Sequence, residues 1–140
     1  MNEAIIKLLS KFANSFDLKD WQTLESTIAD TIECDYQDLR GESETYSKSE
    51  YVSLRKQALG HLKTQHLFAN LEITIDAEYA VCQLNAIIYR QDNAGKQFNS
   101  HAVYRFHLIQ LQSNEWKIEK IKQSILWNEG DSSIHPGVVR

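Results

Sequence analysis

One histidine in the sequence stands in a setting that suits acid–base chemistry. His66 lies in LKTQHLFAN (residues 62–70), with apolar residues around it and Asn70 four positions later. An imidazole has an ordinary pKa of about 6.5, so it can take up or release a proton at neutral pH when a carboxylate fixes its tautomer. The alternative is a structural histidine that is hydrogen-bonded within the core. His66 alone leaves both interpretations open.

Asp17 is the carboxylate that could serve this histidine. It follows Phe16 at the expected end of the first helix, in SFDLKDW (residues 15–21). Either Asp17 or Asp20 could cap the second helix by accepting backbone N–H groups. If Asp20 is the cap, Asp17 is free to point into the interior. A third candidate is Tyr36, at the end of an early strand, because a buried phenol needs a hydrogen-bond partner.

The first 60 residues predict three helices and one strand that would position these side chains. Apolar residues at helical spacing predict helices over 2–16 and 17–29, and a third that begins at the capping-box pattern SKSE (residues 47–50) and ends before Gly60. Between the second and third helices, TIECDYQDL (residues 31–39) alternates apolar and polar residues, as a half-buried strand does. The segment RGESETY (residues 40–46) predicts a polar loop.

The remainder of the chain has the pattern of a sheet. Runs rich in β-forming residues span 64–75, 78–91, 100–112 and 115–126, with short turn-like segments between them. Connections this short favour an antiparallel meander. The predicted class is therefore α+β, with a cone-shaped, curved antiparallel sheet wrapped around three N-terminal helices and a concave space for a small ligand. We predict one domain over residues 1–128 and a tail, 129–140, that frays or folds over the domain as a lid.

Composition argues against several classes of function. The chain has 15 Lys and Arg against 19 Asp and Glu, so it lacks the basic surface that nucleic acids or anionic membranes require. No apolar run approaches the roughly 20 residues of a membrane span. Cys34 and Cys82 form no disulfide or zinc-ligand pattern, which suits a reducing cytoplasm. There is no phosphate-binding glycine loop or nucleophile elbow, and we expect neither a cofactor nor a metal.

Both faces of the predicted sheet carry apolar residues. In the third long run, Tyr104 and Phe106 share one face, whereas Val103 and Ile109 share the other. An apolar outer face predicts that the chain forms a homodimer or homotrimer through it.

Four further histidines are expected to have no catalytic role. His101 and His107 lie six residues apart on one run and make no metal-binding pattern with His66. His61 and His135 are expected to face solvent.

Taken together, these segments resemble a known family. SFDLKDWQTLESTIADTIECDY (residues 15–36), LKTQHLFAN, and near the end EWKI with ILW resemble the scytalone dehydratase branch of the nuclear transport factor 2-like superfamily, which also includes SnoaL-like polyketide cyclases and ketosteroid isomerases. The resemblance covers roughly residues 5–128. It implies that Asp17 pairs with His66 of the Thr-Gln-His motif and that Tyr36 holds a water facing the substrate.

Some positions depart from the family pattern. A tyrosine that precedes the family's aspartate is replaced by Phe16, which cannot donate a hydrogen bond. The family's second catalytic histidine falls near Tyr89. Its substrate-contacting serine and asparagine fall near Val103 and Arg105 or, with a slip of one residue, near Tyr104 and Phe106. We therefore expect a substrate other than scytalone.

These patterns predict a cofactor-independent lyase (dehydratase) or isomerase/cyclase that acts on an apolar cyclic or polyketide-like substrate. His66 would move the proton, Asp17 would orient it, and Tyr36 would polarise a carbonyl group. The alternative is a non-catalytic module of the same fold that binds a ligand or oligomerises. The predicted substrate contacts are Phe16, Asn70, Tyr89, Tyr104, Phe106 and, at the cavity rim, Trp127.

Overall fold

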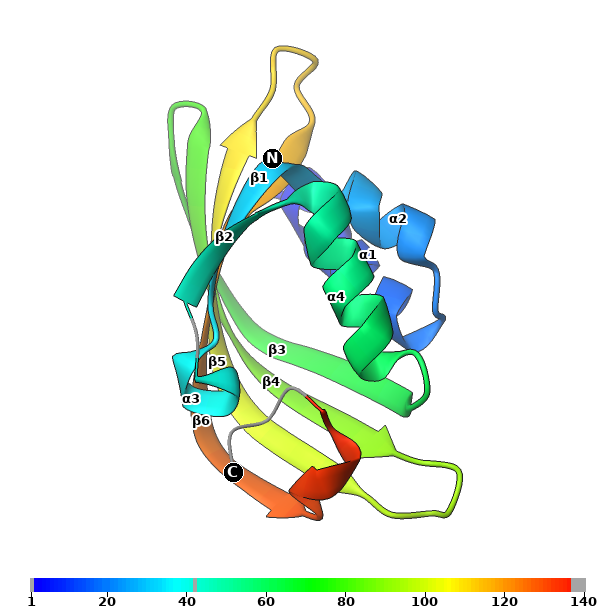
Figure 1. The fold of residues 1–140 in the computed structure, drawn as a ribbon. Coiled ribbons are helices and arrows are strands. Elements are labelled where there is room, and N and C mark those ends of the chain that lie inside the picture. Colours follow the sequence, from blue (N-terminus) through cyan, green and yellow to red (C-terminus); the bar gives the residue numbers. More distant parts are fainter. Residues whose placement is uncertain (1, 42, 137–140) are drawn as a thin grey trace.

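The computed structural model describes residues 2–41 and 43–136, and in it a curved six-stranded sheet wraps around a layer of helices (Figure 1). The strand order is β2-β1-β6-β5-β4-β3. This is the α+β arrangement predicted from the sequence. The helices are α1 (Glu3–Asp17), α2 (Trp21–Ser26), α3 (Gln37–Arg40), α4 (Lys48–Leu59) and the 3-10 turn η1 (Ser132–Ile134). The strands are β1 (Ile28–Asp35), β2 (Ser43–Ser47), β3 (Lys63–Asp76), β4 (Tyr79–Gln91), β5 (Phe98–Gln110) and β6 (Trp116–Gly130).

Helix α1 forms where one apolar stripe recurs at helical spacing. Its buried face includes Ile5, Leu9, Phe12 and Phe16, which pack into the concave side of the sheet. Burying each of these side chains contributes roughly 1.5–3 kcal/mol. Asn2 occupies the N-cap position, but its side chain makes no capping hydrogen bond within the described residues. Packing against the sheet, rather than capping, therefore stabilises this helix.

The other two predicted helices begin at side-chain caps. Asp20 caps α2 by accepting a hydrogen bond from the Thr23 backbone N–H at 3.1 Å. Ser47 and Glu50 form the predicted capping box at the start of α4, each side chain accepting from the other's backbone N–H at 3.2 Å. Because Asp20 serves as the cap, Asp17 is not needed for that role.

The long strands β3 to β6 form the predicted antiparallel meander, but the prediction of a wholly antiparallel sheet is wrong at one junction. Strand β1 pairs with β6 in parallel, with Cys34 opposite Ile121. Parallel pairing requires a long crossover connection. Here the whole chain between β1 and β6 supplies it, so β1 lies beside the last strand.

The prediction of a loop over residues 40–46 is also wrong. The chain forms the short helix α3 and then β2, which pairs antiparallel with β1 and places Glu44 opposite Cys34. The segment is polar because it is an exposed edge strand, and edge strands commonly carry polar side chains. Its strand conformation comes from pairing with β1 and not from its own composition.

After β6 the chain turns back onto the domain. The Asp131 backbone N–H bonds to the Gln97 carbonyl at 2.8 Å, and Ile134 and His135 are buried. Figure 1 shows this segment, drawn in red, turning back from the end of β6 towards the domain. Among the described residues, no helix has the length and apolar character that crossing a membrane would require.

Candidate active site

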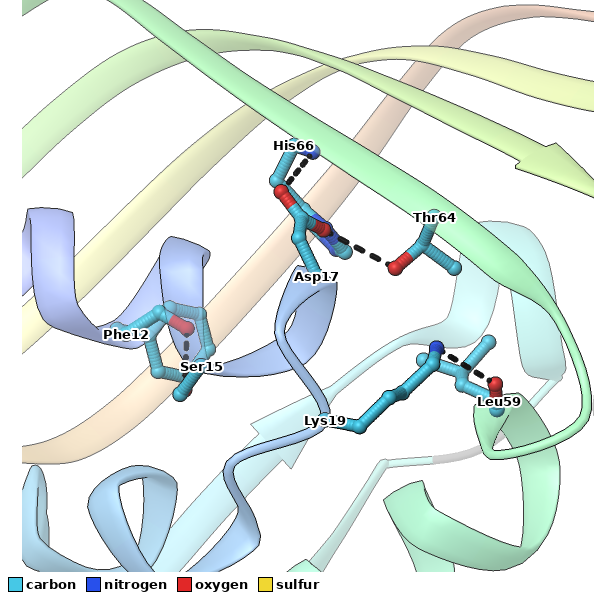
Figure 2. A network of polar contacts seen from close by, with 7 residues as sticks. All are labelled: Phe12, Ser15, Asp17, Lys19, Leu59, Thr64 and His66. Carbon is cyan, nitrogen blue, oxygen red and sulfur yellow. Dashed lines mark hydrogen bonds and ion pairs between the residues drawn. The ribbon is translucent and has the colours of Figure 1, made fainter.

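Asp17 and His66 meet inside the concave side of the sheet (Figure 2). The Asp17 Oδ1 atom lies 2.7 Å from His66 Nδ1 and accepts a second hydrogen bond from the Thr64 hydroxyl at 3.0 Å. The other oxygen, Oδ2, accepts from the His66 backbone N–H at 2.8 Å. Three contacts to neighbouring positions of β3 fix the carboxylate, so the end of α1 is held against the start of β3.

The local chain conformation leaves Asp17 available for this contact. Asp17 is the last residue of α1, where the helix dipole disfavours a negative charge. Two residues on, Lys19 adopts a left-handed backbone with φ of 57°, and its ammonium group donates to the Leu59 carbonyl at 3.0 Å (Figure 2). Burial lowers the pKa of Lys19, while the nearby Asp17 charge opposes that shift. The lysine therefore places a positive charge near the Asp17 carboxylate.

These contacts fix the tautomer of His66. A carboxylate only accepts hydrogen bonds, so Nδ1 carries the proton and Nε2 keeps a free lone pair. Burial lowers the pKa of His66, and the hydrogen bond and charge of Asp17 oppose this effect, whereas Arg90 and Lys19 reinforce it. We conclude that the imidazole is neutral at pH 7, which is the form that acts as a base.

His66 faces a cavity bounded by α1, α4 and the sheet. Phe16 forms one wall and stacks on the imidazole, with ring centroids 5.0 Å apart. The empty space in the cavity and at its mouth is about 420 Å³, a volume that includes open solvent. Of this space, about 30 Å³ admits the centre of a water molecule, enough for two or so waters. A larger occupant must therefore displace side chains or the C-terminal segment.

A group of aromatic and basic residues forms the wall near α3 and α4. Tyr36 and Tyr51 bring their hydroxyls within 3.2 Å of each other, and both rings are buried. The Arg55 guanidinium lies over these rings, 5.4 Å from the Tyr36 centroid and 5.6 Å from that of Tyr51. Burial raises the pKa of the Tyr36 phenol well above its ordinary value. Tyr36 therefore stays protonated and can donate a hydrogen bond.

The wall formed by the sheet contributes a second polar group. The Gln123 amide donates to the Tyr104 hydroxyl at 2.8 Å. Arg90 lines the same cavity, and its Nη1 donates to the Ser100 hydroxyl at 2.9 Å. Burial raises the pKa of Tyr104, partly offset by the charges of Arg90 and Arg55. The cavity thus combines a base, two phenols and two guanidinium groups.

Sequence comparison assigns the chain to a family. The family model of the SnoaL-like domain matches residues 2–122. The chain belongs to this family. A scytalone dehydratase-like protein of Claviceps purpurea (strain 20.1) is 29% identical over 136 residues, covering 88% of this chain and 85% of the relative. The scytalone dehydratase of Pyricularia oryzae is 28% identical over 134 residues, covering 86% of this chain and 77% of the relative.

Solved structures confirm the fold of this SnoaL-like domain. The Kfla4162 protein of Kribbella flavida superimposes with a TM-score of 0.86 at 19% identity, covering 93% of both chains. A type 2 hexachlorocyclohexane dehydrochlorinase (LinA) gives a TM-score of 0.78 at 20% identity, covering 96% of this chain and 93% of its own. A Streptomyces avermitilis protein of the nuclear transport factor 2-like family gives 0.76 at 12% identity, covering 89% and 96%. These likenesses confirm the predicted fold.

The SnoaL-like cavity brings together five of the predicted site residues. Asp17 and His66 form the pair described above. Phe16, Tyr36 and Tyr104 line the same cavity and are almost fully buried. Their roles in catalysis or binding remain predictions.

Four predicted substrate contacts lie elsewhere. Phe106 is fully buried behind the wall, against Phe12, and does not line the cavity. Asn70 is exposed at a bulge of β3 with φ of 56°. Tyr89 and Trp127 are 42% and 53% exposed, and each lies outside the cavity lining. Register explains the misplacement of Tyr89, because alternate residues of a strand point to opposite faces and its neighbour Arg90 takes the inward position.

The sequence-based prediction missed four polar residues of the cavity lining, Arg55, Arg90, Gln123 and His135, as well as the apolar Phe12, Leu39 and Leu59. Arg90 alternates along β4 with the buried residues Ala86 and Ile88, so the alternation of the strand could have predicted that its side chain points inward. The expectation that His135 faces solvent is wrong, because the chain folds back after β6 and leaves this residue 2% exposed. His61 is exposed as predicted, although its ring bonds the Ile134 carbonyl at 3.2 Å.

Proposed function

We propose that this SnoaL-like domain is a cofactor-independent lyase that removes water, or a comparable leaving group, from a small carbonyl compound. The observation that carries the proposal is the buried Asp17–His66 pair, whose unprotonated Nε2 borders a cavity with donor phenols. The names of the relatives and of a structural neighbour, which are dehydratases and a dehydrochlorinase, support an elimination.

In the proposed mechanism, His66 Nε2 takes a proton from the carbon next to the carbonyl group. The electron pair of the broken C–H bond forms the new double bond as the neighbouring C–O bond breaks. The imidazolium then returns the proton to the departing hydroxyl, so the products are an unsaturated carbonyl compound and water. Asp17 stabilises the transient imidazolium, and Tyr36 donates to the carbonyl oxygen as charge develops there.

Each charge change in this mechanism has a physical basis in the site. The lowered pKa of His66 keeps the base deprotonated at neutral pH before the reaction. The Asp17 carboxylate, held by three hydrogen bonds, is in place to compensate the positive charge that His66 gains. Phe16 covers the imidazole face and limits water there, which strengthens these electrostatic interactions.

The test begins by screening aromatic and polyketide-like carbonyl compounds that carry a hydroxyl group, first by thermal shift and then by turnover. His66→Asn and Asp17→Asn should each lower turnover of the best substrate by about 10² to 10⁴-fold, because proton transfer contributes that much to rate. His101→Asn is the matched control, since His101 also contacts a carboxylate but lies on the outer face of the sheet.

Two outcomes would contradict the proposal. Turnover that survives unchanged in His66→Asn or in Asp17→Asn, with folding retained, would remove the general base. A His66 imidazole that stays neutral to low pH in an NMR titration and does not respond to any bound compound would favour the alternative, a ligand-binding module in which the pair is only structural.

A further inference from the structure

The cavity contains a buried positive charge that the proposed elimination does not use. Arg55, on α4, is 6% exposed, and its Nε–H donates to no atom among the residues that the structure describes. The guanidinium lies over the rings of Tyr36 and Tyr51. Burial of a charged group without an opposite charge is costly, and contacts with aromatic rings offset only part of that cost. This arrangement is suited to binding an anion.

A second guanidinium faces the same cavity from the opposite wall. Arg90 of β4 lines it together with His66, and its charge acts on both His66 and Tyr104. The charge of Arg55 acts on Tyr104 as well. Tyr104 is therefore within the electrostatic influence of both cations. Asp17, the carboxylate that contacts His66, is engaged by Thr64 and His66.

The side-chain amide of Gln123, next to Tyr104, has only one of its two polar atoms hydrogen-bonded within the described residues. The Gln123 side chain is 4% exposed; its nitrogen donates to the Tyr104 hydroxyl, and its oxygen contacts no donor in the described part of the chain. Reversing the amide would leave the nitrogen unused instead, so one polar atom remains available in either orientation. Buried polar atoms are normally paired, and a bound ligand would supply the missing partner.

We propose that the substrate of this cavity carries a carboxylate group, which binds to Arg55 near the Tyr104 and Gln123 pair while the reacting carbon faces His66. This inference rests on the proposed elimination, because it assumes that the molecule bound in the cavity is a substrate. Carboxylate binding itself can be measured without any turnover. A guanidinium forms two parallel hydrogen bonds with a carboxylate, a geometry that an amide or ester cannot match. The substrate class is therefore a small organic acid rather than a neutral apolar molecule.

The experiment compares acids with their neutral isosteres. Benzoate, cinnamate and 3-hydroxy-3-phenylpropanoate are each titrated against the corresponding primary amide by calorimetry or by NMR, at a pH where the acids are ionised. At least one acid should bind about tenfold or more tightly than its amide, since hydrogen bonds to a charged group discriminate by that much. If no acid of the series binds more tightly than its amide, the proposal is wrong; this comparison requires no variant.

Variants test which residue of the cavity causes the preference for acids over their amides. Arg55→Gln should abolish it, whereas Arg105→Gln, which removes the same charge from an exposed position of β5, should leave it unchanged. Thermal unfolding checks that both variants fold. A preference that persists in folded Arg55→Gln would overturn the assignment to Arg55. His66→Asn should retain the preference for acids even though it loses turnover, so failure of the carboxylate proposal and failure of the proposed lyase give different results.

Discussion

Two histidine–carboxylate pairs in this protein have almost the same contact distance, through Nδ1 of His66 and Nε2 of His101, and very different surroundings. His66 and Asp17 lie 2.7 Å apart, with side chains 6% and 17% exposed. His101 and Glu129 lie 2.6 Å apart, with side chains 16% and 57% exposed. The first pair faces the cavity, and the second lies on the outer face of the sheet, where Trp127 stacks on the imidazole at 4.0 Å. The distance between the groups does not distinguish them.

The difference lies in what surrounds each pair. Asp17 is held by two further hydrogen bonds from Thr64 and the His66 backbone, whereas the Glu129 carboxylate contacts solvent. In a buried site the attraction between opposite charges is several-fold stronger than at the surface, and so is the cost of leaving one charge alone. The comparison teaches that burial and second partners, rather than a short contact, make an imidazole–carboxylate pair suitable for catalysis.

The largest expected difference between the pairs is in stability. Asp17→Ala removes the acceptor of three hydrogen bonds at a buried position and should lower the free energy of unfolding by roughly 3 kcal/mol. Glu129→Ala should cost less than about 1 kcal/mol, because exposed ion pairs contribute little. Urea unfolding of both variants provides the measurement. Equal losses in the two variants would show that burial does not separate the pairs.

A smaller difference is expected in the response to pH. The folded-state pKa of His66 is lowered, so the unfolded chain takes up a proton, at its ordinary pKa of about 6.5, before the folded chain does. The corresponding stability is fully present above about pH 6.5 and is lost as the pH falls through the folded pKa. Unfolding curves from about pH 8 to about pH 5 should show this loss. His66→Asn should remove part of this pH-dependent loss of stability; an unchanged loss in folded His66→Asn would contradict its assignment to His66.

The smallest expected effect is on the oligomeric state, through the outer face of the sheet that surrounds His101 and Glu129. The outer face of the sheet also presents Leu67 and Tyr89, which are 46% and 42% exposed. We expect a homodimer or homotrimer through this face, which would cover His101 and Trp127 and leave the His66 cavity unchanged. Light scattering at micromolar concentration measures the mass, and Leu67→Glu should shift it towards the monomer. A monomeric mass for the unmodified chain would remove the prediction.

Local features of this protein were predictable from the sequence because their partners lie within a few residues. The capping box of Ser47 and Glu50 spans one helical turn, and so does the cap that Asp20 provides for α2. The alternation of β3 to β6 was also evident, since short connections force neighbouring strands to pair. The position of Asp17 was consistent with two roles, capping the second helix or pairing with His66, and the family resemblance favoured the pairing.

The order of residues was enough to identify side chains that could take part in proton transfer and to predict a curved sheet after a group of helices. The folded chain was needed to show that Arg55 of α4, Arg90 of β4 and Gln123 of β6 line the same cavity as His66. It also showed that Asn70, Tyr89 and Trp127 lie outside this lining. Local propensity acts over a few residues, whereas the lining of the cavity depends on strand register, on bulges and on the return of the chain after β6. A shift of one position along a strand moves a side chain to the other face of the sheet.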